Sequence, residues 1–531
     1  MISDLNIQIS PDRCVACGTC VDRCIMDNLR LHVPPCRTEC PLKMNCQGYL
    51  RLLARGEGAK AAEELRKYTP FGAILGRVCH HPCESVCERL KKGDDAVNIR
   101  AVKRYLADSY PEITRSLPVP ARESGKHVAV VGSGPAGLMA AYDLRANGHA
   151  VTVHDAAAEP GGLLRWAIPS FRLPVEEIRA AVSMLGQMGI TFKTGVALGR
   201  EIDIEEMQNR FDAVLLAIGA GPPSRLGIPG EDLTGVLQGM DFLGDIKGGK
   251  TVSPGLSVVV IGGGNAAVDT ALTCARLGVA EIKIVCVERR DEMPAFKAEI
   301  DEAIEQGILI ENCWGPRRFL QTDEGKIRVE MSRCTGLYDG KGAFCPVLDD
   351  TSSLNLDADS VIVAIGQRRG HVSALGLDAG HLSVDPATLA SAAFPAVFCC
   401  GDAVTGPGSV VEAMGQGRAA AVSIDRFLTG EGLDWGRNAW LENGWIPFVE
   451  PDSSRASDAC RREYDRLQVK ERTLSLEVEC GFSTEDAMVE SQRCFGCGRA
   501  AEFNKTCWFC LPCEIECPEE AITVRMPYLL R

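Results

Sequence analysis

The sequence predicts an α/β fold with two nested Rossmann-like domains, a helical N-terminal domain and a small module built from both ends of the chain. Two glycine motifs each follow an apolar strand and precede an amphipathic helix, which is the βα pattern of a parallel sheet. Of the 25 cysteines in 531 residues, ten lie before residue 90 and six after residue 490. The two ends of the chain therefore share one chemistry.

Composition limits the class of protein. A length of 531 residues is sufficient for three or four domains, and 46% hydrophobic with 24% charged residues is typical of a globular chain. A net charge of −14 and a pI near 5.2 disfavour nucleic acid and anionic membranes as partners. The first residues are polar and no apolar run approaches about 18 residues. We therefore expect a cytoplasmic protein whose cysteines are thiolate ligands rather than disulfides.

The first glycine motif lies in HVAVVGSGPAGLMAAYDLRANGHAVTVHD, which contains Gly132-x-Gly134-x-x-Gly137. Its glycines permit a tight turn and the close approach of a pyrophosphate to a helix N-terminus. Asp155 ends the second strand 18 residues after Gly137, where an acid accepts hydrogen bonds from ribose hydroxyls. Strand, turn, helix and acid together predict a dinucleotide site.

A second motif, IGGGNAAVD, places Gly262, Gly264 and Ala267 at the corresponding positions. Two similar strand-and-turn segments, 211–220 and 359–367, flank this region. We therefore expect the second domain to be inserted in the first. A nested pair of dinucleotide domains predicts a flavin and a nicotinamide cofactor.

The C-terminal end carries an iron–sulfur motif. The spacing CxxCxxCxxxCP, which ends at Pro518, is that of bacterial ferredoxins, whose fourth cysteine ligates the other cluster. A matching half near the start of the chain has Ile25 in place of the proline. The two halves predict a ferredoxin-like module with one cluster on Cys14, Cys17, Cys20 and Cys517 and another on Cys24, Cys507, Cys510 and Cys513.

The stretch from about residue 36 to 430 resembles the glutamate synthase small-subunit family, whose flavoprotein half also occurs in dihydropyrimidine dehydrogenase and in NADH-dependent ferredoxin oxidoreductases. The matching motifs are CRTECP, GSGPAGLMAAYDL, GGLLRWAIPSFRLP, IGGGNAAVD, EMPAF and CGDAVTGPGSVVEA. The resemblance implies FAD in the first domain and NAD(H) in the second, with a helix from about Ser409 directing its positive dipole end at the flavin. The cofactor-binding residues that we assign are Gly132, Gly134, Pro135, Ala136, Gly137, Asp155, Gly162, Arg165, Gly219, Gly262, Gly264, Asn265, Ala266, Glu288, Arg289, Gly366, Gly401, Asp402, Ser409 and Val410.

The family also implies two clusters in the helical iron-sulfur domain. Its upstream CxxC pair is missing here, and the CFGC segment near the other end of the chain has the form of that pair. One centre would then be held by Cys36, Cys87, Cys494 and Cys497. The neighbouring centre would lack the family's Gln or Glu ligand, since Lys103 and Arg104 in that helix cannot ligate iron, and would use Cys40, Cys46, Cys79 and Cys83. We prefer four [4Fe-4S] clusters over three clusters with spare thiols.

A nicotinamide transfers a hydride whereas a cluster transfers one electron, so a flavin between them is the chemical adaptor. Hydride transfer needs no protein acid or base, and we predict no catalytic residue. Glu288 lies 21 residues after Ala267, where an acid favours NAD over NADP, although Arg289 and Arg290 are placed to hold a 2′-phosphate.

We expect an FAD-dependent NAD(H) oxidoreductase subunit that exchanges electrons with a protein partner in a larger complex. The added ferredoxin-like motif resembles the reductase subunits of 2-oxoacid:acceptor oxidoreductases such as phenylglyoxylate:NAD oxidoreductase. That resemblance implies a thiamine-diphosphate 2-oxoacid oxidoreductase and a ferredoxin-like subunit as partners. The alternatives are a glutamate synthase small subunit and a subunit of a flavin-based bifurcating NADH:ferredoxin oxidoreductase.

The motifs predict an order of domains along the chain. We expect a ferredoxin-like half at 1–35, a helical iron-sulfur domain at 36–120, an FAD-binding domain at 121–245 and 356–430, an NAD-binding domain at 246–355, a linker and helix at 431–490, and a C-terminal iron-sulfur segment at 491–531. Within the linker, the charged stretch RREYDRLQVKER at 461–472 is typical of a solvent-facing helix.

Overall fold

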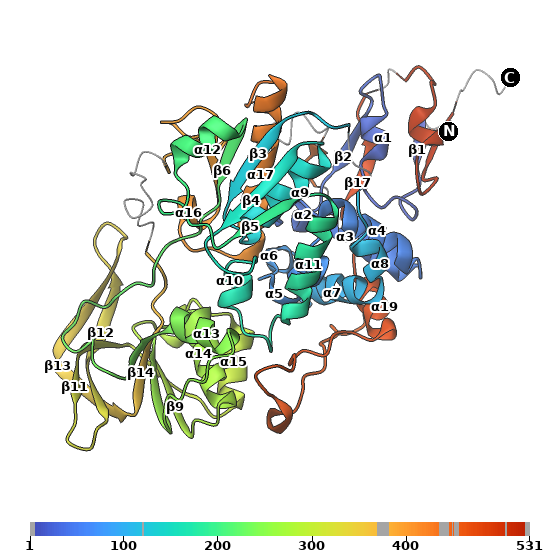
Figure 1. Cartoon of the computed structure of the whole chain (residues 1–531). Coiled ribbons are helices and arrows are strands. Elements are labelled where there is room, and N and C mark those ends of the chain that lie inside the picture. The colour runs from blue at the N-terminus through green and yellow to red at the C-terminus, as the bar shows by residue number, and fades with distance from the viewer. Residues whose placement is uncertain are drawn as a thin grey trace.

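Two parallel five-stranded sheets form the centre of the protein (Figure 1). The computed structural model describes residues 6–118, 122–368, 382–434, 445–448, 450, 456–504 and 507–525. Parts of the predicted linker, at 435–444, 449 and 451–455, lie outside the described residues. The two sheets, the N-terminal helices and a module built from both ends of the chain confirm the predicted fold class.

The first sheet has the strand order β15-β6-β3-β4-β5, and all its pairs are parallel. Its bounds are β3 His127–Val131, β4 Ala150–Asp155, β5 Thr191–Thr194, β6 Ala213–Leu216 and β15 Val397–Cys399. The central strands β3 and β6 are apolar and buried, as expected for a sheet with helices on both faces. The helix α9 (Pro135–Ala146) crosses α17 (Val410–Thr429) so closely that a methyl group on Gly417 would overlap the Ala136 carbonyl.

The second sheet has the order β10-β9-β8-β14-β7, and its pairs are also parallel. Its bounds are β7 Val236–Gln238, β8 Ser257–Ile261, β9 Glu281–Cys286, β10 Leu309–Asn312 and β14 Ser360–Val363. An antiparallel sheet of β11 Trp314–Gln321, β12 Ile327–Tyr338 and β13 Phe344–Ala358 is connected between β10 and β14. The chain leaves the first sheet after β6 and returns for β15, which is the predicted insertion.

The second sheet extends past the boundaries of 246 and 355 that we predicted for its domain. Both β7 and β14 lie outside these limits, yet β14 pairs with β8 on one side and with β7 on the other. The buried strand VIV of β14 completes this sheet because its backbone hydrogen bonds require neighbours on both edges.

The N-terminal helices pack as a separate layer beside the first sheet (Figure 1). They are α2 Pro35–Glu39, α3 Cys46–Ala54, α4 Gly58–Tyr68, α5 Gly72–Val78, α6 Pro82–Ser85, a 3-10 helix Leu90–Lys92, α7 Ile99–Ser109 and α8 Pro111–Thr114. A Cβ at Gly76 of α5 would lie 2.6 Å from the Arg104 Cα of α7. Glycine therefore sets the small separation of these two helices.

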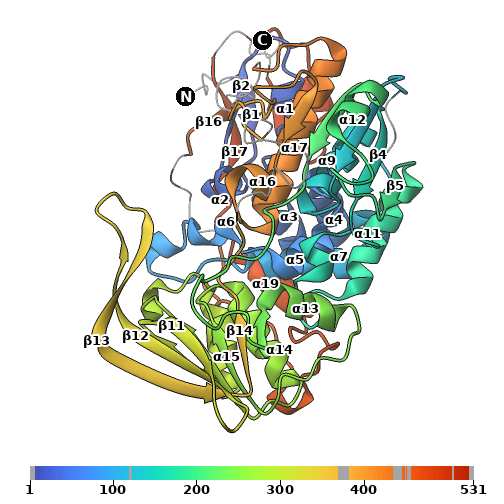
Figure 2. The ribbon, with the colours of Figure 1, turned by 60° about the vertical axis from the view of Figure 1, so that its left-hand side comes forward.

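The two ends of the chain form one module. Strand β1 (Ile7–Ile9) pairs antiparallel with β18 (Ile522–Val524), and β2 (Leu29–His32) lies between β17 (Arg499–Glu502) and β16 (Trp445–Ile446). Two short helices, α1 Thr19–Asp22 and α20 Pro512–Ile515, complete it. Figure 2 shows β1, β2 and β17 of this module in the upper part of the molecule, far from the antiparallel sheet.

The remaining helices connect these parts. They are α10 Leu163–Trp166, α11 Val175–Gln187, α12 Ile204–Arg210, α13 Gly239–Lys247, α14 Asn265–Arg276, a 3-10 helix Arg290–Glu292, α15 Lys297–Glu305, α16 Asp402–Thr405, a 3-10 helix Val469–Glu471 and α19 Thr484–Gln492. In the described part of the chain, no helix is long and apolar enough to span a membrane.

The charged stretch 461–472 does not form the α-helix that we predicted. Two of its arginines instead form ion pairs with different domains. Arg461 pairs with Glu84 of the helical domain at 2.9 Å, and Arg472 pairs with Glu305 of α15 at 2.9 Å. These long-range ion pairs hold the segment across the junction between domains.

Candidate cofactor sites and cysteine groups

The first glycine turn has the geometry of a phosphate cradle. Gly132 has a φ of +103°, and a Cβ there would overlap the Ala217 carbonyl of the next strand. A Cβ on Gly137 would likewise overlap the Gly132 carbonyl, whereas the space beside Gly134 is open. The open space lies at the N-terminus of α9, which begins at Pro135. The turn therefore fits the pyrophosphate of a dinucleotide.

Asp155 stabilises this turn from the end of β4. Its carboxylate accepts hydrogen bonds from the backbone N–H groups of Ser133 (2.7 Å) and Ala157 (2.8 Å) and from the Ser133 hydroxyl. Gly161 N–H in turn donates to the Ser133 Oγ at 3.0 Å. The acid thus holds two loops together at the place where the fingerprint puts a ribose.

Other predicted flavin residues surround the same turn. Gly162 has a φ of +52°, and a Cβ there would lie 2.6 Å from the Gly134 Cα. Arg165 is buried and pairs with Glu159 at 2.6 Å. Two further glycines with positive φ stand at the ends of β6 and β15, namely Gly219 and Gly401.

The segment after β15 supplies two helix N-termini. Asp402 opens α16, and burial raises the pKa of its carboxyl to about 6. Ser409 caps α17, since its Oγ accepts from the Glu412 N–H and the Glu412 carboxylate accepts from the Ser409 N–H. The long helix therefore begins at Val410, where it was predicted.

A cavity of about 820 Å³ joins the two domains. From the flavin domain its lining includes Leu163, Ile168, Asp402, Ser409 and Val410. From the second domain its lining includes Gly262, Gly264, Asn265, Ala266, Glu288 and Gly366. A volume of this size is within the range of cofactor pockets, about 300–1,000 Å³.

The second glycine turn repeats the geometry of the first. Gly262 has a φ of +139°, and a Cβ there would overlap the Ala364 carbonyl. The space beside Gly264, at the N-terminus of α14, is open. Asn265 orders the turn, because its Oδ1 accepts from the Phe296 N–H at 2.8 Å.

Glu288 lies against this turn with unused capacity for hydrogen bonds. Its Oε2 is buried beside the Cys286 thiol and accepts no hydrogen bond of normal geometry from the residues that the structure describes, and it lies 2.6 Å from the position of a Cβ on Gly263. Arg289, which we also predicted at this site, is exposed and does not line the cavity. The unpaired carboxylate oxygen fits a ribose hydroxyl donor.

The terminal cysteines come together as the two expected groups. Cys14, Cys17, Cys20 and Cys517 line one small cavity. Burial, followed by the charges of Cys14, Cys17, Cys517 and Cys513, raises the pKa of Cys20. Burial and the nearby charges of Cys24, Cys507 and Cys510 raise the pKa of Cys513 to about 11. The mutual effect shows that these thiols lie close together, as the ligands of one cluster must.

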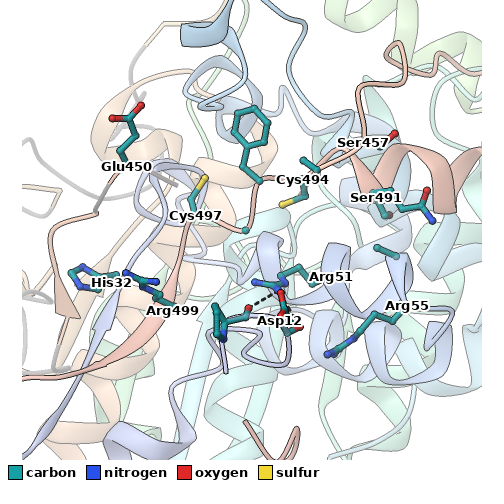
Figure 3. Close-up of a pocket in the computed structure, with 16 residues that line it drawn as sticks. Asp12, His32, Arg51, Arg55, Glu450, Ser457, Ser491, Cys494, Cys497 and Arg499 are labelled. Atoms are coloured by element: carbon teal, nitrogen blue, oxygen red, sulfur yellow. Dashed lines mark hydrogen bonds between the residues drawn. The ribbon is translucent and has the colours of Figure 1, made fainter. Parts of the chain in front are cut away.

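The third group also joins cysteines from distant parts of the chain. Cys36, Cys87, Cys494 and Cys497 line one cavity. Figure 3 shows Cys494 and Cys497 on the wall of a further cavity of about 630 Å³, together with Arg51. The Arg51 guanidinium donates to the Pro11 carbonyl at 2.7 Å, so it connects this group to the N-terminal half of the module.

Cys46 lies between the third and fourth groups. Hydrogen bonds from the Cys36 and Cys83 thiols lower the pKa of Cys46 well below its usual value. The fourth group otherwise comprises Cys40, Cys79 and Cys83, whose charges all act on Lys103. Among the described residues, no three His, Cys, Asp or Glu side chains are close enough to hold a single metal ion. A [4Fe-4S] cluster places each thiolate on a different iron atom and so needs wider spacing.

Sequence reasoning did not identify three residues that line the large cavity. Val78 and His80 flank Cys79 and lie on its wall, and Arg172 pairs there with Asp269 of α14 at 2.8 Å. The signal for His80 was its position beside a predicted ligand. Arg172 had none, because its partner lies 97 residues away.

Comparisons with known proteins agree with this architecture. Residues 126–417 match the pyridine nucleotide-disulphide oxidoreductase family model, and residues 2–114 match dihydropyrimidine dehydrogenase domain II, 4Fe-4S cluster. The chain is 34% identical over 507 residues to the NADP(+)-dependent formate dehydrogenase subunit beta of Moorella thermoacetica, covering 88% of this chain and 70% of that one. It is 30% identical over 455 residues to the glutamate synthase [NADPH] small chain of Azospirillum brasilense, covering 80% and 90%.

A solved structure shows the same fold. The His57Gln mutant of FprA from Mycobacterium tuberculosis aligns with a TM-score of 0.51 at 20% identity, over 58% of this chain and 85% of that one. The chain therefore belongs to the pyridine nucleotide-disulphide oxidoreductase family, within the flavin and iron–sulfur group that includes the glutamate synthase small chains.

Proposed function

We propose that this chain is an electron-transfer subunit that exchanges electrons between NAD(H) and a partner protein through FAD and four [4Fe-4S] clusters. The observation that carries this proposal is the shared wall of the 820 Å³ cavity. Gly262 and Gly264 come from the nicotinamide side, Asp402 from the flavin side, and Val78 from the segment that enters the fourth cysteine group. Three redox sites therefore meet around one space.

The side chains around this cavity bind, orient and exclude water. FAD, when bound, accepts electrons in pairs from a nicotinamide and releases them singly to a cluster. Leu163, Ile168, Met240 and Leu243 form an apolar wall, which keeps water from the reacting rings. The N-terminus of α17 at Val410 contributes a positive dipole end. No protein acid or base is required, and we assign no catalytic residue.

The cysteine groups form a continuous series away from the cavity. The fourth group adjoins the cavity through Val78 and His80, and Cys46 joins it to the third group. Arg51 connects the third group to the terminal module, and Cys20 has Cys513 among its charged neighbours. This order provides a path for single electrons from the flavin to the surface.

NAD(H) is the nucleotide that we propose for the second site. The relatives named above carry NADP or NADPH in their names, so this assignment is a departure from them. The reason is Glu288, whose unpaired Oε2 accepts ribose hydroxyls and repels a 2′-phosphate. Arg289 and Arg290 are exposed, and neither lines the cavity.

The partner is proposed to contact the outermost cysteine group. Cys510 is exposed, and four large apolar side chains in the same module are also exposed: Ile25, Phe503, Trp508 and Ile515. The ion pairs Arg23–Glu516 and Arg13–Glu520 neutralise charge around them. An exposed apolar surface of this kind favours a permanent contact with another subunit. We propose that the partner is a thiamine-diphosphate 2-oxoacid oxidoreductase with its ferredoxin-like subunit, and that the complex is cytoplasmic.

A glutamate synthase small subunit is the second candidate, because one relative of this name is matched over 90% of its length. Such a subunit needs no second ferredoxin motif, which this chain has in the cysteine runs next to the paired strands β1 and β18. Mass spectrometry of the native complex distinguishes the candidates. Co-purification of a large amidotransferase, or of a second flavoprotein as in a bifurcating enzyme, would replace the 2-oxoacid assignment.

Iron content tests the clusters. We expect about sixteen iron atoms per chain, since sixteen cysteines are grouped in fours. About twelve would support three clusters with spare thiols, and an iron-free protein would remove the electron path.

Two cysteine variants test the grouping. Cys36→Ser and Cys494→Ser should lose the same cluster, because these residues line one cavity although they are 458 positions apart. Their electron paramagnetic resonance spectra should match each other and differ from that of Cys507→Ser. If Cys494→Ser instead resembles Cys507→Ser, the third group is wrongly assembled.

A further inference from the structure

Lys103 is a buried cation beside the fourth cysteine group. It lies on α7 and only 3% of its surface is exposed. Among the described residues, no acidic side chain forms an ion pair with it. Lys103 immediately precedes Arg104, whose Cα lies against Gly76 of α5, and Cys79 caps the end of that helix. The charged neighbours of its amine are the thiols of Cys79, Cys83, Cys40 and Cys46. Its positive charge therefore faces sulfur.

The next residue of the helix, Arg104, is a buried cation that does have acidic partners. Arg104 is 4% exposed and pairs with Glu477 at 3.0 Å and with Asp108 at 3.3 Å. Burial of an unpaired ammonium group is strongly unfavourable, so Lys103 requires a negative counter-charge as well. Four thiolates with a cluster supply that charge, whereas four neutral thiols do not.

The fourth group lies next to the large cavity, so the charge of Lys103 acts close to the proposed flavin site. Val78 and His80, on either side of Cys79, line the cavity that joins the two nucleotide turns. A cluster held there would lie beside a flavin bound in this cavity and would be placed to exchange electrons with it. Because reduction adds negative charge to a cluster, a buried cation beside it favours the reduced form.

We propose that Lys103 is the counter-charge of the cluster held by Cys40, Cys46, Cys79 and Cys83, and that it raises the reduction potential of this cluster relative to its neighbours. The inference rests on the proposed cluster at these four cysteines. Lys103 is not a ligand of iron in this inference. It acts on the reduction potential of the cluster through its charge alone.

The test is a redox titration of the full chain, followed by electron paramagnetic resonance. Lys103→Met should lower the potential of one cluster so that its one-electron equilibrium changes at least tenfold, about 59 mV. Lys103→Arg keeps the charge and should retain the potential. Lys60→Met, an exposed lysine in the same helical domain, is the matched control and should change nothing.

The outcomes separate this inference from the proposed function. Full iron in Lys103→Met with an unchanged potential overturns the role of Lys103 and leaves the four clusters intact. Loss of four iron atoms in Lys103→Met but not in Lys103→Arg supports the counter-charge, and loss in both overturns it. If the Cys79→Ser variant contains as much iron as the wild type, the cluster itself is refuted.

Discussion

The two nucleotide turns share a backbone but differ in the acid that follows them. In each turn the first glycine has a positive φ and no room for a Cβ, because a strand carbonyl lies against it: Ala217 beside Gly132 and Ala364 beside Gly262. In each, the second glycine faces open space at a helix N-terminus. The same local solution therefore serves both cofactors.

The acids are used differently. Asp155 is occupied by hydrogen bonds from Ser133 and Ala157, so it holds its turn closed before any ligand is present. Glu288 accepts no hydrogen bond of normal geometry at its buried Oε2 from the described part of the chain. The first turn is suited to a cofactor that stays bound, and the second to one that binds and leaves in each cycle. The predictions below test this difference.

The largest effect is expected at the first turn. Gly132→Ala places a Cβ against the Ala217 carbonyl and strains a φ of +103°, so FAD should fall below about a tenth of the wild-type content. The measurement is the flavin released by denaturation, and we expect one FAD per wild-type chain. Gly186→Ala, at an open position on α11, is the control. Release of FMN from the wild type would contradict the assignment of this turn.

The equivalent change in the second turn should separate the two cofactors. Gly262→Ala meets the Ala364 carbonyl, but FAD is assigned to the other domain and should be retained. The rate of flavin bleaching by NADH should fall at least about tenfold, which corresponds to about 1.4 kcal/mol. A variant that lost FAD as well would show that the turns do not act independently.

Local pattern explains why both turns could be predicted. A strand, three spaced glycines and a helix all lie within about 30 residues, so the fold there follows from neighbours in sequence. The inclusion of β7 in the second sheet and the non-helical path of residues 461–472 could not be predicted in this way. They depend on partners such as β14 and Glu84, which are far along the chain and form no periodic pattern.

The cysteine groups lie between these extremes. Spacing predicted the terminal module, because the ferredoxin motif is local. The association of Cys36 with Cys494 came from the family resemblance, and the structure places both on one cavity. The resemblance placed Lys103 in the helix beside the fourth group, but its burial could not be predicted, because a lysine in an amphipathic helix is ordinarily exposed.

A moderate effect is expected on nucleotide preference. Glu288→Arg exchanges an acceptor of ribose hydroxyls for a cation that pairs with a 2′-phosphate, so the ratio of kcat/KM for NADH over NADPH should fall at least about tenfold. The comparison uses an artificial acceptor at fixed ionic strength. Arg290→Ala, on the exposed side of the loop, should leave the ratio nearly unchanged. Better use of NADPH by the wild type would overturn the NAD assignment.

The smallest effect concerns the contact that joins the two domains. Lys247 of α13 donates through Nζ to the Leu164 carbonyl at 2.8 Å and to the Ile168 carbonyl. These carbonyls belong to the α10 region, which follows Gly162 and packs over the flavin turn. Burial, reinforced by Arg165, lowers the pKa of Lys247 to about 7. The link between the domains is therefore sensitive to pH.

The sign follows from proton counting. Between pH 7 and about 10.4 an unfolded lysine stays protonated while folded Lys247 is mostly neutral, so the unfolded state binds more protons and stability rises with pH. The slope from this one group is at most about 1.4 kcal/mol per pH unit, and it vanishes below pH 7. Between pH 7 and 9.5, the Tm of Lys247→Met should rise less than that of the wild type, by the part that comes from Lys247. Both proteins are measured at one scan rate after their FAD and iron contents have been verified. Lys250→Met, whose lysine is exposed and pairs with Asp245, should keep the wild-type slope. Equal slopes in the wild type and Lys247→Met would mean that folded Lys247 does not lose its proton in this pH range, which would contradict the lowered pKa.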